Sequence, residues 1–132
     1  MEHRLRWRIA SVLLLAAWIV TAILNMRRVH VPFVTTHLAD VALPAWLYIG
    51  LRELDGRPHG RRWSLGRLAR SPEIAGALLF AGAAATELSQ AYWPSKMFRG
   101  TFDPIDIFAF AAGIGGCYVA DKRGSGQTRT SP

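Results

Sequence analysis

The sequence has a single cysteine, few acidic residues and no motif of a known catalytic site. Because Cys117 stands alone, an internal disulfide is excluded, and its position in an apolar run favours a small packing residue over a reactive thiol. No nucleotide-binding glycine loop, nucleophile elbow, Ser-His-Asp set or H-E-x-x-H zinc motif is present. We therefore favour a protein that is not an enzyme, without settling the question, and we expect no cofactor and no metal.

Acidic residues are outnumbered by basic ones, and the basic residues are not gathered in one stripe. The chain has 16 Lys and Arg against 9 Asp and Glu, a formal charge of +7 and a pI near 10.8. The arginines flank apolar blocks, and no nucleic-acid-binding module is recognisable, so we predict no nucleic-acid partner. Hydrophobic residues make up 51% of the chain although it also has many charged side chains. The apolar and the charged residues lie in separate blocks of the sequence.

Four apolar runs predict an all-α integral membrane bundle of four transmembrane helices. The first run has no charge over 17 residues and would span about 25 Å as a helix, and a cleaved signal peptide is its alternative interpretation. The length allows one domain, residues 1–121, followed by a disordered tail over 122–132. The predicted spans are residues 9–25, 35–51, 73–93 and 104–120.

Local patterns predict where the third and fourth helices begin. Ser71 followed by Pro72 is a typical helix start, and the Gly- and Ala-rich run that follows predicts the central helix of the bundle. Asp103 followed by Pro104 predicts the start of the fourth helix, with Asp106 in its first turn. Two small-xxx-small pairs in that helix predict close packing: Ala109 with Gly113, and Ala112 with Gly116.

Basic residues outside the spans predict the orientation in the membrane. The two termini and the 52–70 segment together have twelve Lys and Arg, and the other two connections have four. The positive-inside rule then places both termini in the cytoplasm, with the protein in a bacterial inner membrane.

This orientation predicts that polar residues from separate helices converge at the outer end of the bundle. Ionisable residues inside spans are costly, so the cluster is a candidate site for a small polar or cationic group or for a lipid-linked envelope precursor. Interhelical hydrogen bonding and helix capping are the structural alternatives, and Asp103 and Asp106 fit capping well. The candidate ligand-binding residues are Glu87, Gln90, Asp106, Asp40, Arg99, Asp103 and His37.

Two other functions stay open from the sequence. A membrane enzyme would use Glu87 or Asp106 as a general acid or base, and a small proton-coupled transporter would use the same carboxyl groups as proton carriers. Membrane lipids are the expected partners, and a homo-oligomer stays open because four short helices make a narrow pathway.

The second half of the chain resembles the VanZ-like family of small bacterial membrane proteins, or a closely related uncharacterised four-span family. The 35–51 segment also resembles the family's second span, which opens with His and Asp. The residues that carry the resemblance are Glu87-x-x-Gln90, Pro94, a basic residue at Lys96 or Arg99, Asp106 and Gly113.

Two features depart from the family's pattern. Phe110 stands where the family often has Asn, and the loop before the last helix is longer, with "GTFDP" inserted. The resemblance implies a cell-envelope protein of about four spans, and the family's named member is associated with reduced sensitivity to a glycopeptide antibiotic.

Overall fold

The computed structural model describes residues 2–32, 34–55, 71–92 and 102–127, and every element within these ranges is helical. The all-α prediction is therefore confirmed for the described part of the chain. The elements are α1 (Glu2–Met26), the π-helical turn η1 (Val34–Leu38), α2 (Ala39–Asp55), α4 (Pro72–Tyr92) and α5 (Pro104–Gln127).

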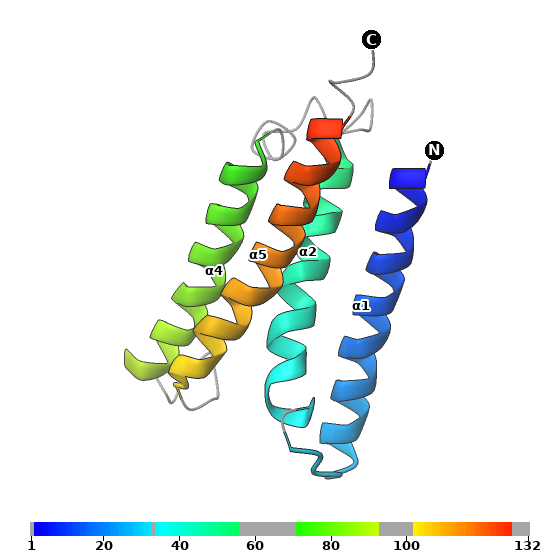
Figure 1. The fold of residues 1–132 in the computed structure, drawn as a ribbon. Helices are drawn as coiled ribbons and strands as arrows, with labels where there is room; N and C mark the ends of the chain where they lie inside the picture. The colour runs from blue at the N-terminus through cyan, green and yellow to red at the C-terminus, as the bar shows by residue number, and fades with distance from the viewer. Residues whose placement is uncertain (1, 33, 56–70, 93–101, 128–132) are drawn as a thin grey trace.

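The helices run side by side in alternating directions (Figure 1). Helices α1 and α4 run one way, and α2 and α5 run the other way, so the start of α1 and the end of α5 lie at the same end of the bundle. We call this the N/C end. The opposite end, where η1 begins, is called the His37 end.

Helix α2 is the central helix of the bundle. It contacts α1, α4 and α5, and its Tyr48 and Ile49 are almost completely buried. The prediction that the third run, now α4, forms the centre was wrong. Ala75 of α4 is buried, but Ala77, Ala81, Gly82 and Ala85 are exposed, and a side chain added at Gly82 would meet no atom within 4 Å.

Three helical segments are long and apolar enough to cross a membrane: Leu5–Met26, Pro72–Tyr92 and Pro104–Gly124. Only 6% of the first segment is buried inside the bundle, so most of its apolar side chains face outward, as lipid-facing side chains do. The predicted second span is not among the three, since α2 has only 17 residues after the π-helical turn.

The helices extend beyond the apolar runs at the N/C end. Helix α1 begins at Glu2, before the predicted span that starts at residue 9, and α5 continues to Gln127, beyond the predicted span that ends at residue 120. The predicted tail from residue 122 is thus helical up to 127, and residues 128–132 lie outside the described residues. Within this extension, Lys122 forms an exposed ion pair with Glu73 of α4.

The predicted helix starts are confirmed by their capping hydrogen bonds. The backbone N–H of Ile74 donates to Ser71 Oγ at 3.4 Å, and that of Ile105 donates to Asp103 Oδ1 at 2.9 Å. Each side chain satisfies one of the amides that a helix start leaves without a partner. Helices α4 and α5 therefore begin at Pro72 and Pro104, as the sequence predicts.

Helix α5 approaches the backbone of α2 most closely at Gly113. A Cβ built on Gly113 would overlap the carbonyl oxygen of Val41, and Ala109, one turn earlier, is buried. This small-xxx-small pair therefore packs as predicted. The second pair does not, since a side chain added at Gly116 would meet no atom within 4 Å.

Candidate functional site

Six of the seven candidate residues lie at the His37 end, brought there from four segments. Helices α2 and α5 begin at this end and α4 finishes there, so residues distant in sequence become neighbours (Figure 1). Arg99 lies outside the described residues. The six are His37 of η1, Asp40 of α2, Glu87 and Gln90 of α4, Asp103 before α5 and Asp106 in its first turn.

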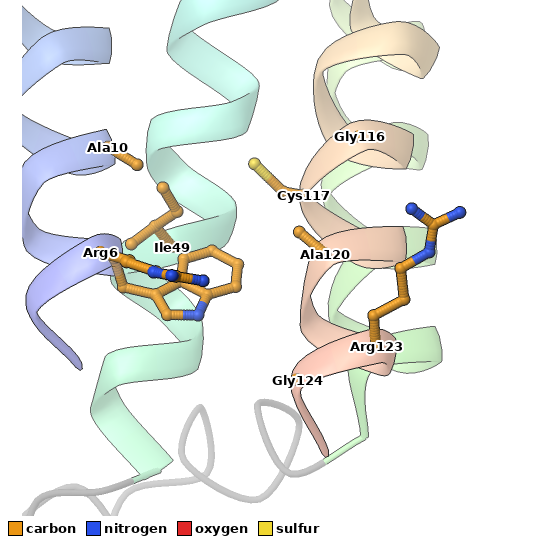
Figure 2. Close-up of a pocket in the computed structure, with 9 residues that line it drawn as sticks. Arg6, Ala10, Ile49, Gly116, Cys117, Ala120, Arg123 and Gly124 are labelled. Atoms are coloured by element: carbon orange, nitrogen blue, oxygen red, sulfur yellow. The ribbon is translucent and has the colours of Figure 1, made fainter. Parts of the chain in front are cut away.

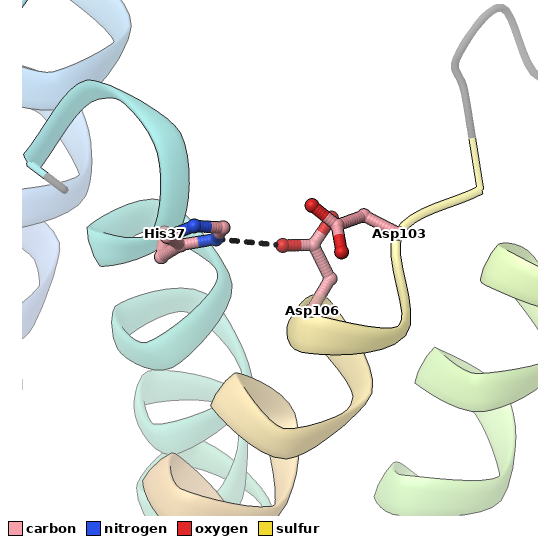
Figure 3. Close-up of side chains that lie close together, drawn as sticks. All are labelled: His37, Asp103 and Asp106. Carbon is pink, nitrogen blue, oxygen red and sulfur yellow. Dashed lines mark hydrogen bonds and ion pairs between the residues drawn. The ribbon is translucent and has the colours of Figure 1, made fainter. Parts of the chain in front are cut away.

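His37 and Asp106 form the contact that joins η1 to α5. One ring nitrogen of His37, Nδ1, lies 3.0 Å from Asp106 Oδ1 (Figure 3). The two side chains are 15% and 18% exposed, so the contact is mostly shielded from solvent. The π-helical turn presents His37 toward α5, 69 positions away in sequence.

Asp103 and Asp40 extend this contact on either side. Asp103 lies beside Asp106, and single ligand atoms of His37, Asp103 and Asp106 all lie within 4.8 Å of one another (Figure 3). One oxygen of Asp103 caps α5. Asp40, three residues after His37, lies within electrostatic range of Asp106, Glu87 and His37.

Glu87 brings a buried carboxylate to the same place from α4. Glu87 is only 6% exposed, and Gln90 Nε2 donates a hydrogen bond to Glu87 Oε1 at 3.2 Å. The other oxygen, Oε2, is buried and has no hydrogen-bond partner among the described residues. Three groups at or just before the start of α5 act on Glu87: the backbone amide of Asp103 and the carboxylates of Asp103 and Asp106. We call the five titratable residues, His37, Asp40, Glu87, Asp103 and Asp106, the His37 cluster.

The His37 cluster holds more acidic groups than basic ones. Four carboxyl groups face one imidazole, and no lysine or arginine within the described ranges pairs with the four. Buried carboxylates are costly unless a cation or a proton compensates them. The arrangement can therefore bind a cationic group, hold protons, or ligate a metal ion through nitrogen and oxygen.

The N/C end contains a second buried acid that the sequence analysis missed. Asp121 is 5% exposed and accepts hydrogen bonds from Arg52 Nε at 2.6 Å and from Tyr48 Oη at 3.2 Å. The sequence analysis counted Arg52 among the loop residues that set the topology. The spacing of four between Tyr48 and Arg52 is the signal that predicts a shared helix face.

A separate cavity of about 370 Å³ lies at the N/C end between α1, α2 and α5 (Figure 2). Its walls are mainly apolar, with Trp7 and Ile49 among them, and Arg6 and Arg123 stand on opposite sides. Cys117 also lines it and lies 3.8 Å from the carbonyl oxygen of Ala45, in keeping with a packing role. None of the six described candidate residues lines this cavity, so they and the cavity are distinct.

Comparison with known proteins gives no relative for this chain: no protein-family model, no curated protein and no solved structure matches it. The resemblance to VanZ-like proteins therefore depends on the quoted residues alone.

Proposed function

We propose that the protein is a four-span protein of a bacterial inner membrane, with both termini in the cytoplasm. Three segments qualify as spans by length and composition. The turn η1 and helix α2 are continuous and together cover 22 residues, a length that reaches across a hydrocarbon core. The twelve-to-four distribution of basic residues supports the cytoplasmic assignment of the N/C end.

The proposed function is the binding of a cationic group, free or part of a lipid-linked envelope molecule, by the His37 cluster. The observation that carries it is the unpartnered oxygen of Glu87, buried beside two further carboxylates. Burying a charge without a partner destabilises a protein by several kcal/mol. On insertion scales, an acid at the middle of a span costs on the order of 3 kcal/mol. A bound cation would compensate that cost.

The resemblance to VanZ-like proteins supports a place in the cell envelope. Glu87 and Asp106 are among the residues that carry this resemblance and belong to the His37 cluster, and Gln90, another of them, donates a hydrogen bond to Glu87. A ligand on the outer side of the inner membrane is what this resemblance implies. A non-enzymatic binding role is favoured over catalysis because, among the described residues, no hydroxyl or thiol group is hydrogen-bonded to an acid of the His37 cluster.

Cysteine accessibility tests the membrane placement. Single cysteines at 37, 40, 87, 90 and 106 in a Cys117→Ser background would be exposed to a membrane-impermeant thiol reagent in cells with a permeabilised outer membrane. We expect labelling from the periplasmic side at positions 37 and 106, which are partly exposed. Labelling at these positions only from the cytoplasmic side of inverted vesicles would contradict the proposed orientation.

Thermal protection by a simple cation tests the proposed function. The purified protein in detergent should unfold at a higher temperature as methylammonium is added, because binding to the folded state alone stabilises it. Glu87→Gln should lose this protection, and Glu73→Gln, fourteen positions away on the same helix and exposed, should keep it. Equal protection of all three proteins would contradict cation binding at the His37 cluster.

A further inference from the structure

Three side chains of the His37 cluster have the chemistry and the spacing of metal ligands. His37, Asp103 and Asp106 each offer one nitrogen or oxygen atom, and these atoms lie within 4.8 Å of one another (Figure 3). Zinc is bound by His nitrogen at about 2.0–2.1 Å and by carboxylate oxygen at about 2.0–2.2 Å, usually with four ligands in tetrahedral geometry. Small rotations of the three side chains would place their ligand atoms at three of the four tetrahedral positions around one ion.

Glu87 supplies an independent indication of a ligand at this place. It comes from a different helix, it is 6% exposed, and its Oε2 has no hydrogen-bond partner in the described part of the chain. Asp103, which precedes α5, and Asp106 in its first turn are the charged groups that act on it most strongly. Helix capping accounts for Asp103, but it gives no reason for a buried, unpaired carboxylate oxygen on α4.

We propose that the His37 cluster binds one divalent cation of the zinc type, with His37, Asp103, Asp106 and Glu87 as ligands. The inference rests on the proposed function, of which it names the class of cation. The imidazole favours Zn²⁺ over Mg²⁺ and Ca²⁺, which prefer oxygen ligands, and the three carboxylates also suit Mn²⁺. Asp40 lies close enough to Asp106 to act on it electrostatically.

Binding of the ion would connect three elements that otherwise meet only through side-chain contacts. The ligands belong to η1, to α4 and to the start of α5. The sequence analysis expected no metal because the ligands have no local spacing. The fold brings these ligands together although they are far apart in sequence, because four segments meet at the His37 end.

The test is a calorimetric titration of Zn²⁺ into the purified full chain in detergent. The protein carries a purification tag without histidine, is treated with a chelator and then dialysed, and has the Cys117→Ser substitution to remove the one thiol. We expect saturable binding with about one ion per chain, and competition by Mn²⁺ but not by Mg²⁺. No saturable binding of Zn²⁺ or Mn²⁺ would overturn the proposal.

Matched substitutions locate the ion. His37→Gln and Asp106→Asn should each weaken Zn²⁺ binding by about tenfold or more. The controls are His30→Gln, an exposed histidine on the preceding turn, and Glu73→Gln, an exposed acid at the N/C end of α4. Both should bind as the parent protein does, and equal binding by all four variants would place the ion elsewhere and overturn the proposal.

A measurement on the parent protein guards against variants that fail to fold. Zn²⁺ should slow the carbethoxylation of His37 by diethylpyrocarbonate, followed by mass spectrometry, and leave that of His30 unchanged. Equal rates at His37 with and without Zn²⁺ would overturn the metal site. If methylammonium still protects the protein in that case, the proposed binding of a cationic group stands and the metal inference alone fails.

Discussion

Each end of the bundle buries one carboxylate to nearly the same degree, but the two carboxylates differ in their hydrogen-bond partners. Asp121 at the N/C end is 5% exposed, and Glu87 at the His37 end is 6% exposed. Asp121 is held by an arginine and a tyrosine, whereas one oxygen of Glu87 has no partner among the described residues. Pairing, and not depth of burial, therefore separates the structural acid from the candidate site.

The surroundings of the two acids reinforce this difference. At the N/C end each acidic side chain described on α4 and α5 meets a cation: Asp121 meets Arg52, and Glu73 meets Lys122. At the His37 end the acids meet one another and a single histidine. A ligand is needed only where the charges of the protein do not balance.

The largest effect is expected at the paired end. Arg52→Met leaves the buried carboxylate of Asp121 without its cation, which should lower the free energy of unfolding by about 3–5 kcal/mol. Thermal or denaturant unfolding in detergent measures it. Lys122→Met is the control, since its pair with Glu73 is exposed and should contribute nothing measurable. Equal loss in both variants would remove the distinction between buried and exposed pairs.

A smaller effect is expected where α2 and α5 meet beside the His37 cluster. Gly113→Ala should cost about 1–3 kcal/mol, because its new methyl group overlaps the backbone of Val41. The displacement should also weaken cation binding, since Val41 follows Asp40 directly. The matched control is Gly115→Ala on the same helix, where nothing lies within 4 Å. A Gly113→Ala protein as stable as this control would show that the close approach is absent.

The smallest effect is expected at the unpaired acid. Glu87→Gln removes a charge that no described cation compensates, so the ligand-free protein should be stabilised, by about 1 kcal/mol or less because a polar amide stays buried. Chelator-treated protein must be used, since a bound cation would hide the gain. A loss above about 2 kcal/mol, the size expected for a satisfied buried group, would show that the carboxylate is paired.

Much of the fold was predictable because membrane spans leave a strong composition signal. The long uncharged run of α1 and the Ser-Pro and Asp-Pro helix starts all lie where the sequence indicates. The central role of α2 was not predictable, since it depends on tertiary contacts at Tyr48 and Gly113 that have no local pattern. The charged end of α5 was not predicted either, because the sequence alone does not show that Lys122 lies beside Glu73 of α4.

The candidate site was predictable as a group but not in its pairing. Helix directions alone bring the polar residues to one end, and this needs only the number of spans. The contact between His37 and Asp106 and the bare oxygen of Glu87 depend on side-chain placement. Sequence reasoning accordingly gave Asp103 a capping role, which it has, and could not foresee that it also lies beside His37.

The most direct test compares the two buried acids in one experiment. The free energies of unfolding of Glu87→Gln and Asp121→Asn should be measured in the same detergent, after chelator treatment, against the parent protein. The account predicts opposite signs: Asp121→Asn is destabilised because its charge-assisted bonds with Arg52 and Tyr48 are lost, and Glu87→Gln is equal to the parent or more stable. Two losses of similar size would contradict it, because both acids would then serve only to hold the bundle together.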